Sequence, residues 1–251
     1  MSARFENKVA FITGAGSGIG RAVAQRLARE GATVVGADVD DDGLAGTAGS
    51  LAGAAGVFRA VHLDVSQRAD CIAAVDACVA EHGGLDILGN IAGIVHASHF
   101  TDVTEDAYRR VMAINIDGPF FLAQAAMPHL VARAGHLINV SSNSGVHGTP
   151  YLSAYSTSKH AIVGLTRALA TEYVKTGVRV NCIAPAGTST NITKNFHMPA
   201  DVDIDLAMRM AGFRGQNQPD EVAALFAFVA SDEAPGIHGA VLRVDRGLTV
   251  V

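Results

Sequence analysis

The chain has 251 residues, of which 49% are hydrophobic and 17% are charged, and its formal net charge is −5. This composition excludes an intrinsically disordered chain, because such chains carry more charge and fewer aliphatic side chains. A negative balance with no basic run argues against nucleic acid as a partner. We find neither an apolar stretch long enough to cross a membrane nor a signal segment at the N-terminus. We therefore expect a globular, cytoplasmic protein that has no membrane partner.

The three cysteines, Cys71, Cys78 and Cys182, form an odd set without the spacing of metal ligands. Cys71 and Cys78 lie seven residues apart in a helical pattern, so we expect them on one helix face. All three are predicted to be buried, reduced thiols, as is typical of proteins in a reducing compartment.

Short apolar runs alternate with helical patterns along the whole chain. The predicted strands span residues 8–13, 32–37, 57–63, 85–89, 135–140, 178–183 and 240–244, and the predicted helices span 18–30, the forties, 67–82, 104–133, 153–176 and 219–231. Continuous apolar strands between helices indicate a parallel sheet that is covered on both faces. Right-handed crossovers then give a doubly wound, Rossmann-like α/β fold of about seven strands, with ligands at the C-terminal strand ends. No linker or repeat divides the chain, so we expect one domain over residues 1–251.

A glycine-rich turn, TGAGSGIG at residues 13–20, separates the first predicted strand from the first predicted helix. Glycines let the backbone turn sharply and approach a pyrophosphate, and the helix N-terminus offers free N–H groups to its charge. A tight turn without a ligand is the alternative interpretation. The position between a strand and a helix favours a dinucleotide site. The residues predicted to contact the cofactor here are Gly14, Gly16, Ser17, Gly18, Ile19 and Gly20.

Asp38 closes the second predicted strand, where a carboxylate can hold the ribose diol of an adenosine. Asp40, Asp41 and Asp42 follow, and this acidic cluster would repel a 2′-phosphate. Neither position 17 nor position 39 carries a lysine or arginine that could attract one. The pattern therefore favours NAD over NADP. A helix N-cap or a turn residue is the alternative role for Asp38.

Further cofactor contacts are expected after the third and fourth predicted strands. Asp64 and Val65 end the third strand, where a side chain could bond the adenine amino group. Asn90, Ala92 and Gly93 follow the fourth strand, next to the middle of the cofactor.

Tyr155 and Lys159 are four residues apart in a helical pattern and therefore share one helix face. A free tyrosine titrates near ~10, which is too high for a base at neutral pH. A nearby cation stabilises the phenolate, and lowering the pKa by about three units corresponds to ~4 kcal/mol. Lys159 together with a positively charged nicotinamide ring could supply that stabilisation. An ordinary helix face is the alternative, because this spacing is common by chance.

Taken together, these motifs resemble the short-chain dehydrogenase/reductase family over nearly the whole chain. The resemblance rests on TGAGSGIG at 13–20, Asp64-Val65, NIAG at 90–93, Asn115, Ser142 in NVSSNSG, YSTSK at 155–159 and NCIAPAGTST at 181–190. The order and the spacing of these motifs agree with the family as well.

The resemblance implies a catalytic role for each member of a tetrad. Tyr155 would be the general base in alcohol oxidation and the general acid in carbonyl reduction. Lys159 would lower the pKa of Tyr155 and bind the nicotinamide ribose. Ser142, rather than Ser141, would bond the substrate oxygen. Asn115 would interrupt its helix and hold a water that links Lys159 to solvent.

The resemblance also places Pro185, Gly187, Thr188 and Thr190 beside the nicotinamide and the phosphates. Three departures from the family pattern concern neighbouring positions. Ala186 stands inside the usual Pro-Gly pair, Ile91 replaces an asparagine of the usual NNAG, and Arg246 replaces a glycine of the terminal VDGG. An arginine at position 246 could alter a subunit contact.

Substrate contacts are expected from the loops at 94–101, 143–152 and 187–215. The candidates that we single out are His96, Ser144, His147 and Tyr151, with Val95, Phe196, His197 and Met198 as further possibilities. His96 and His99 alone do not make a metal site, so we predict no metal. Segment 187–215 is expected to be a mobile lid, whose apolar residues suit a bulky alcohol or simply form a small core of their own.

The leading hypothesis is an NAD-dependent oxidoreductase that transfers a hydride between the cofactor and a secondary alcohol or ketone. A 3-oxoacyl-thioester reductase is the alternative within the family, although such members usually take NADPH, which Asp38 opposes. A non-catalytic dinucleotide sensor is the alternative from another class, and a methyltransferase would leave Tyr155 and Lys159 unexplained. The resemblance also implies a homotetramer, built from helices 104–133 and 153–176 and the C-terminal strand.

Overall fold

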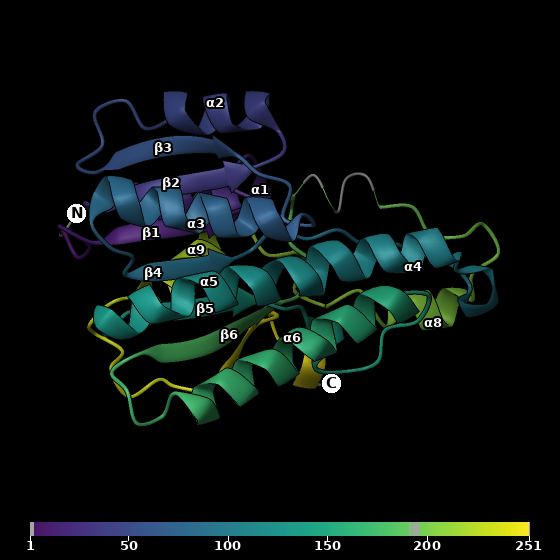
Figure 1. The fold of residues 1–251 in the computed structure, drawn as a ribbon. Coiled ribbons are helices and arrows are strands. Elements are labelled where there is room, and N and C mark those ends of the chain that lie inside the picture. The colour runs from purple at the N-terminus through teal and green to yellow at the C-terminus, as the bar shows by residue number, and fades with distance from the viewer. Residues whose placement is uncertain (1–2, 191, 193–195, 251) are drawn as a thin grey trace.

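The computed structural model describes residues 3–190, 192 and 196–250 of the chain. Seven strands form one sheet in the order β3-β2-β1-β4-β5-β6-β7, and all six neighbouring pairs are parallel (Figure 1). The strands are β1 (Val9–Thr13), β2 (Thr33–Asp38), β3 (Val57–His62), β4 (Ile87–Asn90), β5 (His136–Val140), β6 (Arg179–Pro185) and β7 (Val241–Val244). The strand order reverses between β1 and β4, and ligands bind at such a switch point in doubly wound sheets. This architecture confirms the predicted fold class.

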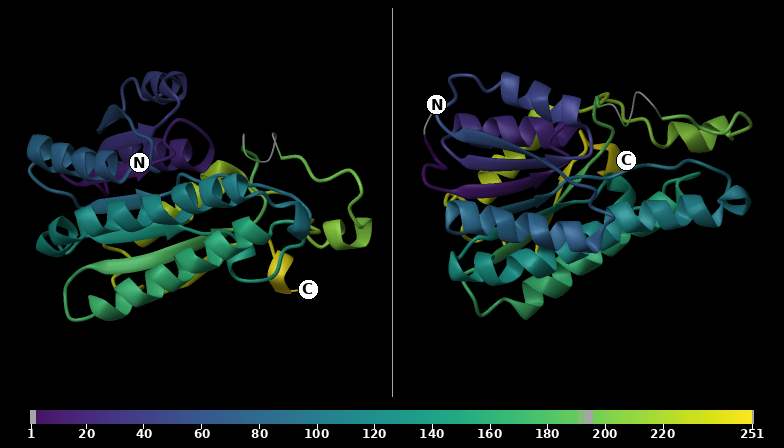
Figure 2. Two further views of the ribbon diagram at one scale, coloured as in Figure 1. Left: turned by 45° about the vertical axis from the view of Figure 1, so that its right-hand side comes forward. Right: turned by 45° about the horizontal axis from the view of Figure 1, so that its top comes forward.

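Helices cover both faces of the sheet, as Figure 1 and Figure 2 show from three directions. One face carries α1 (Gly18–Arg29) and α9 (Pro219–Ala230), and the other carries α3 (Arg68–His82), α4 (Glu105–Met112), α5 (Gly118–Ala132) and α6 (Ser153–Glu172). Helix α2 (Asp41–Gly49) flanks the β3 edge, and the short α8 (Ile204–Met208) lies beyond the C-terminal strand ends. Three single 3-10 turns complete the described elements: η1 (Phe100–Asp102), η3 (Asn143–Gly145) and η4 (Leu248–Val250). None of the helices in the described ranges is both long and apolar enough to span a bilayer.

Two apolar cores explain why most strands are continuous apolar runs. Ile12 of β1 packs into the core under α1 and α9, whereas its neighbour Phe11 packs into the core under α3 and α5. Cys71 and Cys78 both lie in the second core, as their helical spacing predicted, and both are free thiols. Strand β3 differs from the prediction of buried strands, because it is an edge strand whose residues are exposed or half-buried.

The predicted helix over 104–133 is interrupted in the structure. A π-helical segment, η2 (Ala113–Asp117), separates α4 from α5 and contains Asn115. This interruption agrees with what the family resemblance implied for Asn115. Helix α8 was not predicted, and its N-cap is Asp203, whose side chain accepts a hydrogen bond from the Leu206 N–H at 3.1 Å.

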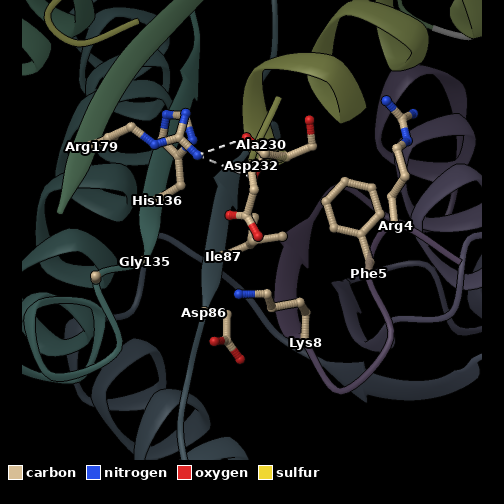
Figure 3. Close-up of a pocket in the computed structure, with 12 residues that line it drawn as sticks. Arg4, Phe5, Lys8, Asp86, Ile87, Gly135, His136, Arg179, Ala230 and Asp232 are labelled. Carbon is tan, nitrogen blue, oxygen red and sulfur yellow. Dashed lines mark hydrogen bonds between the residues drawn. The ribbon is translucent and has the colours of Figure 1, made fainter. Parts of the chain in front are cut away.

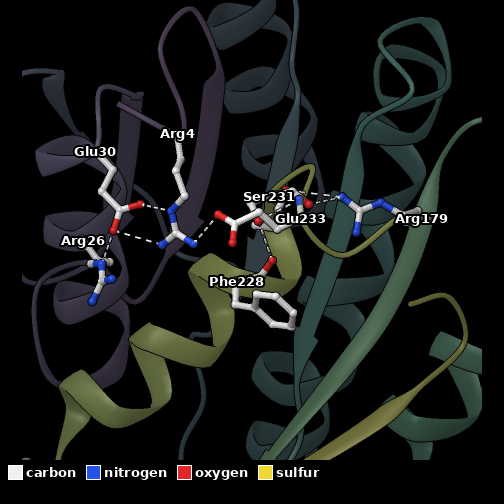
Figure 4. A network of polar contacts seen from close by, with 8 residues as sticks. Arg4, Arg26, Glu30, Arg179, Phe228, Ser231 and Glu233 are labelled. Atoms are coloured by element: carbon white, nitrogen blue, oxygen red, sulfur yellow. Dashed lines mark hydrogen bonds and ion pairs between the residues drawn. The ribbon is translucent and has the colours of Figure 1, made fainter. Parts of the chain in front are cut away.

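Charged side chains tie α9 to the N-terminal ends of the strands. The Arg179 guanidinium donates to the carbonyl oxygens of Val229, Ala230, Ser231 and Ala234, where α9 ends. Figure 3 shows Arg179 beside Ala230. Arg4 pairs with Glu30 after α1 and with Glu233 after α9 (Figure 4). The cavity in this region measures about 20 Å³, which is room for about one water molecule. This cavity is therefore too small for a larger ligand.

Candidate active site

Two adjoining clefts lie at the C-terminal ends of the strands. The first, the cofactor cleft, has a volume of about 310 Å³ and is lined by the glycine-rich turn, Asp38 and residues that follow β3 and β4. The second, the substrate cleft, has a volume of about 260 Å³ and contains Ser142, Tyr155 and Lys159. Five residues line both clefts and make them continuous: Ile19, Ile91, Gly93, Thr190 and Ile192.

The glycine-rich turn is fixed to β4 and opens onto the start of α1. The Thr13 hydroxyl oxygen accepts hydrogen bonds from the backbone N–H groups of Ile91 and Ala92, at 2.9 and 3.1 Å. A Cβ at Gly20 would lie 2.1 Å from the carbonyl oxygen of Gly14, so only glycine permits this close packing. Helix α1 begins with no side-chain cap and no acidic residue in its first turn. Its N–H groups are therefore available to an anion such as a pyrophosphate.

Asp38 lies in the wall of the cofactor cleft, at the end of β2. Its two carboxylate oxygens accept hydrogen bonds from the N–H of Gly16 at 2.9 Å and from that of Asp40 at 3.1 Å. Gly16 does not line the cleft but holds this carboxylate. The N-cap of α2 is Asp40, whose side chain accepts from Gly43, so Asp38 is not a helix cap.

The residues after β3 and β4 differ in how they meet the cofactor cleft. Asp64, Val65, Ala92 and Gly93 line it, and hydrogen bonds from Ser66 lower the pKa of the Asp64 carboxyl. The side chain of Asn90 does not line either cleft. Its amide nitrogen is buried and donates to the Asn139 side chain at 2.9 Å and to the Pro119 carbonyl at 3.2 Å. Asn90 therefore links β4 to β5 and α5, unlike the cofactor contact that we expected.

Three elements bring the predicted tetrad together. Tyr155 and Lys159 project from the first turns of α6, Ser142 follows β5, and Asn115 comes from η2. A Cβ at Gly93 would lie 3.2 Å from the Asn115 side-chain oxygen and 3.3 Å from Lys159 Nζ, so these two groups converge on one point. The four residues that the family resemblance singled out therefore lie close together in space.

Asn115 is locked by hydrogen bonds on both ends of its amide. Its Oδ1 accepts from the N–H of Ile94 at 2.9 Å, and its Nδ2 donates to the Ile94 carbonyl at 2.9 Å. The same Nδ2 donates to the hydroxyl of Ser158 at 3.0 Å. Ser158 is fully buried and its hydroxyl donates to the Tyr155 carbonyl at 2.7 Å. Sequence reasoning missed Ser158, although its place directly before Lys159 on a buried helix face was a usable signal.

Burial dominates the electrostatics of the tyrosine–lysine pair. Burial lowers the pKa of Lys159 to about 8, and its ammonium donates to the Val140 carbonyl at 3.0 Å. The ammonium lies 5.7 Å from the centroid of the Tyr155 ring. Burial raises the pKa of Tyr155, and a hydrogen bond with Ser142 opposes that rise. Burial therefore opposes formation of a phenolate at this site.

Of the two adjacent serines after β5, Ser142 is the one that contacts Tyr155. The Ser142 hydroxyl donates to the side-chain oxygen of Asn143 at 2.9 Å and accepts from the N–H of Ser144 at 3.2 Å. The Ser141 hydroxyl instead donates to the Lys159 carbonyl at 2.7 Å and so anchors α6. These contacts agree with the choice of Ser142 over Ser141.

The predicted substrate contacts divide into two groups. Ser144, Val95 and Phe196 line the substrate cleft, whereas the side chains of His96, His147, Tyr151, His197 and Met198 line neither cleft. Tyr151 has a φ of +62°, and its hydroxyl accepts a hydrogen bond from the Asp203 N–H at 2.7 Å, next to α8. Burial lowers the pKa of His147.

Pro185, Gly187, Thr188 and Thr190 all line the substrate cleft, as expected from the family resemblance. Four further cleft residues lie in the loops where substrate contacts were expected but were not singled out, namely Asn143, Thr149, Leu152 and Met210. Gln216 also lines the cleft and lies just outside the expected loops. Within the described ranges, no group of three or more metal-ligating side chains is present.

Comparison with known proteins identifies the family. A family model described as enoyl-(acyl carrier protein) reductase matches residues 14–249. Meso-2,3-butanediol dehydrogenase from Serratia marcescens is 39% identical over 98% of this chain and 96% of its own length. The chain belongs to the short-chain dehydrogenase/reductase family.

Solved structures of short-chain dehydrogenases superpose closely on this chain. The enzyme from Mycobacterium paratuberculosis bound to NAD has a TM-score of 0.91 and 30% identity, over 99% of this chain and 100% of its own. The enzyme from Burkholderia cenocepacia in complex with NADP has a TM-score of 0.88 and 31% identity, over 98% of this chain and 99% of its own. The chain is therefore an oxidoreductase that uses a nicotinamide dinucleotide and acts on a secondary alcohol or ketone.

Proposed function

We propose that the enzyme prefers NAD to NADP and that it oxidises a small, uncharged secondary alcohol. The observation that carries the cofactor preference is the Asp38 carboxylate in the wall of the cofactor cleft. A carboxylate at this place bonds a ribose diol and repels a 2′-phosphate. Arg110 is the one cation among the described residues that line the cofactor cleft. Its charge lowers the pKa of Asp64, but the hydrogen bonds from Ser66 lower it more.

The protein residues in the two clefts suit a nicotinamide dinucleotide. The uncapped start of α1 would hold the pyrophosphate, Asp38 the adenosine ribose, and Lys159 the second ribose. When bound, the cofactor supplies a hydride acceptor and the positive charge of its nicotinamide ring.

The catalytic roles follow from the contacts of each side chain. We assign Tyr155 as the general base that takes the alcohol proton at its phenol oxygen, and Ser142 as the hydroxyl that bonds the substrate oxygen. Lys159 supplies a cation near the phenol, and Asn115 holds the backbone of Ile94 beside it. An enzyme with this division of roles needs all four side chains. A non-catalytic sensor would not need them.

The substrate cleft favours a small, uncharged substrate. Lys159 is the one charged side chain among the described residues that line it. Pockets for drug-sized ligands measure about 300–1,000 Å³. The substrate cleft of about 260 Å³ has to hold the nicotinamide end of the cofactor as well as the substrate. A steroid-sized alcohol or a 3-oxoacyl thioester fits this space less well than a small secondary alcohol.

The decisive experiment measures NADH or NADPH formation at 340 nm with aliphatic, cyclic, steroid and 3-hydroxyacyl-thioester alcohols. We expect turnover of a small alcohol with NAD, and none of it in Tyr155→Phe. In Asp38→Ala, the ratio of kcat/KM with NAD to that with NADP should fall about 10- to 100-fold. Asp42→Asn is the matched control, because it removes a charge of the same acidic cluster outside the cleft wall. A wild-type preference for NADP, or for the thioester, would contradict the proposal.

We further propose that the enzyme is a cytoplasmic homotetramer, assembled through α4, α5 and α6. Exposed aromatic side chains on these helices support this surface, since Tyr108 of α4 is 44% exposed and Phe120 of α5 is 45% exposed. The free, buried cysteines agree with a reducing compartment. Light scattering after size-exclusion chromatography should give four times the mass of one chain, and a monomer mass would contradict the assembly.

A further inference from the structure

The turn after β7 holds an arginine in a conformation that favours glycine. Arg246 has a φ of +49° and the next residue, Gly247, has a φ of +83°. A glycine at position 246 would adopt this backbone without strain, and glycine is the residue that the family pattern has there. The contacts of the Arg246 side chain therefore have to offset the strain of its backbone.

The Arg246 guanidinium joins three partners near the substrate cleft. Its Nε donates to the side-chain oxygen of Asn217 at 3.2 Å, and its Nη1 donates to the Arg214 carbonyl at 3.1 Å. Its Nη2 donates to both carboxylate oxygens of Glu221 at 2.5 and 2.7 Å. Glu221 also accepts from the N–H of Gln218 at 2.6 Å, so the guanidinium is anchored to the first turn of α9.

Further hydrogen bonds hold the chain at Asn217, directly after Gln216. The Asn217 N–H donates to the Gly187 carbonyl at 2.8 Å, and the Ser189 N–H donates to the Asn217 carbonyl at 2.9 Å. The Asn217 side chain is buried and donates to the Val244 carbonyl at 2.5 Å. The backbone on both sides of Gln216 is thus fixed by bonds to β7, to α9 and to the loop after β6.

Gln216 itself lines the substrate cleft. Its Cγ would lie 3.7 Å from a Cβ at Gly187, so the side chain lies against the loop that follows β6. Gln216 is exposed at the cleft wall, and its amide group hydrogen-bonds to no side chain or backbone group within the part of the chain that the structure describes. A polar side chain that a clamped backbone holds in a cleft wall is suited to bind a ligand.

We propose that Gln216 is a specificity-determining residue whose amide bonds a second oxygen of the substrate, and that Arg246 is the positioning residue that holds it there. The inference rests on the proposed function and adds the substrate class. An amide both donates and accepts hydrogen bonds, so the group it recognises is a hydroxyl or a carbonyl without charge. The substrate class is then a diol or a hydroxyketone rather than a simple alcohol.

The test compares substrates that differ by one oxygen: 2,3-butanediol with 2-butanol, and 1,2-cyclohexanediol with cyclohexanol. Gln216→Leu should raise the KM for the diols about tenfold and change that for the simple alcohols less than about twofold. Arg246→Gly, which relieves the backbone strain and therefore folds, should raise the KM for the diols about fivefold. The KM for NAD should not change in either variant.

The double variant decides whether Arg246 acts through Gln216. If it does, the double variant has the KM of Gln216→Leu alone, whereas independent effects would multiply and overturn the positioning role. Arg243→Ala is the matched control, because Arg243 bonds Thr249 and not the 214–217 stretch. Hydrogen exchange at residues 214–217 should accelerate in Arg246→Gly, and unchanged exchange would contradict the clamp. If Gln216→Leu raised the KM for diols and for simple alcohols equally, this would contradict the contact with a second substrate oxygen. If the wild type turned over none of these alcohols, the proposed function itself would fail.

Discussion

The position of Asn115 depends on a serine that belongs to no catalytic motif. Ser158 accepts a hydrogen bond from the Asn115 amide and donates one to the Tyr155 carbonyl, and it is fully buried. It therefore links the π-helical segment to the helix that carries Tyr155. A loss of this hydroxyl would leave a buried N–H without its partner, which costs about 1–3 kcal/mol.

We predict that Ser158→Ala lowers the free energy of unfolding by about 1–3 kcal/mol and lowers kcat more than it raises the KM for NAD. Urea unfolding and steady-state kinetics measure the two effects. Ser156→Ala is the control on the same helix, because the buried Ser156 hydroxyl has no partner among the described residues. Its removal should leave stability unchanged or slightly raised, and equal losses in both variants would contradict the role of Ser158.

At the scale of single residues, the sequence predicted which side chains converge at α6 better than it predicted which loop side chains line the cleft. Ser142, Tyr155 and Lys159 sit on or beside regular elements, so fixed spacings carry them to one point. The side chain of Tyr151 turns toward Asp203, because its left-handed backbone redirects a loop that no periodicity describes. Asn90 ends a strand inside the sheet, and its amide meets Asn139 on the neighbouring strand.

Among the elements, the junction of β1 and α1 tolerates the least change. A Cβ at Gly20 would lie 2.1 Å from the Gly14 carbonyl oxygen, which neither backbone can avoid without moving the turn. We predict that Gly20→Ala raises the dissociation constant for NAD more than about tenfold, because the helix start no longer meets the pyrophosphate. Isothermal titration calorimetry measures it. Gly49→Ala in α2 is the control, since no atom lies within 4 Å of its Cβ position, and reduced NAD affinity there would count against this explanation.

The end of α9 depends on one guanidinium from β6. Arg179 donates to the carbonyl oxygens of Val229 and Ala230, which the helix geometry leaves without N–H partners, and to those of Ser231 and Ala234 just after the helix. We predict that Arg179→Ala lowers the free energy of unfolding by about 2–4 kcal/mol, measured by urea unfolding. Arg109→Ala removes an exposed pair with Glu105 within α4 and should cost about 0.5 kcal/mol or less. Similar losses in the two variants would show that the capping role of Arg179 is wrong.

At the scale of the whole molecule, buried thiols set the response to alkaline pH. Burial raises the pKa of Cys71 and Cys182 to about 11 and that of Cys78 to about 12. Unfolded thiols ionise near ~8.5, so above this pH the unfolded chain loses protons that the folded chain keeps. The three thiols stabilise the fold fully below about pH 8.5, and their contribution is lost as the pH rises toward the folded values.

Lys159 has the opposite effect on alkaline stability. Its pKa is about 8 in the folded chain, below the unfolded value near ~10.4, so between these values its contribution to stability increases with pH. One lysine opposes three thiols, and stability should therefore fall by about 3 kcal/mol per pH unit between pH 9 and 10. Urea unfolding at half-unit pH steps measures this slope. Cys78→Ala should reduce the slope by about 1.4 kcal/mol per pH unit, and an unchanged slope would contradict this account.

The parallel sheet and both helix layers were predictable from the alternation of strands and helices, whereas the order of the strands came from the structure. The exposure of β3 could not be predicted, because which strand lies at the edge of a sheet depends on pairing with segments far away in the chain. Helix α8 was not predicted either, because its five residues are too few for a periodic signal. The role of Arg246 needed the structure as well, since its partners are 25 to 32 residues away in the chain.

The π-helical segment between α4 and α5 amounts to one additional residue in an otherwise regular helix. Each residue of an α-helix turns the chain by about 100°, so deleting a residue there would rotate all of α5 relative to α4. Leu122, Ala126 and Leu130, which now face the core, would point elsewhere, and Asn115 would leave Ile94. The additional residue in η2 therefore determines both how α5 packs against the core and where Asn115 lies. Insertions and deletions at 113–117 should therefore be tolerated less than those in a surface loop.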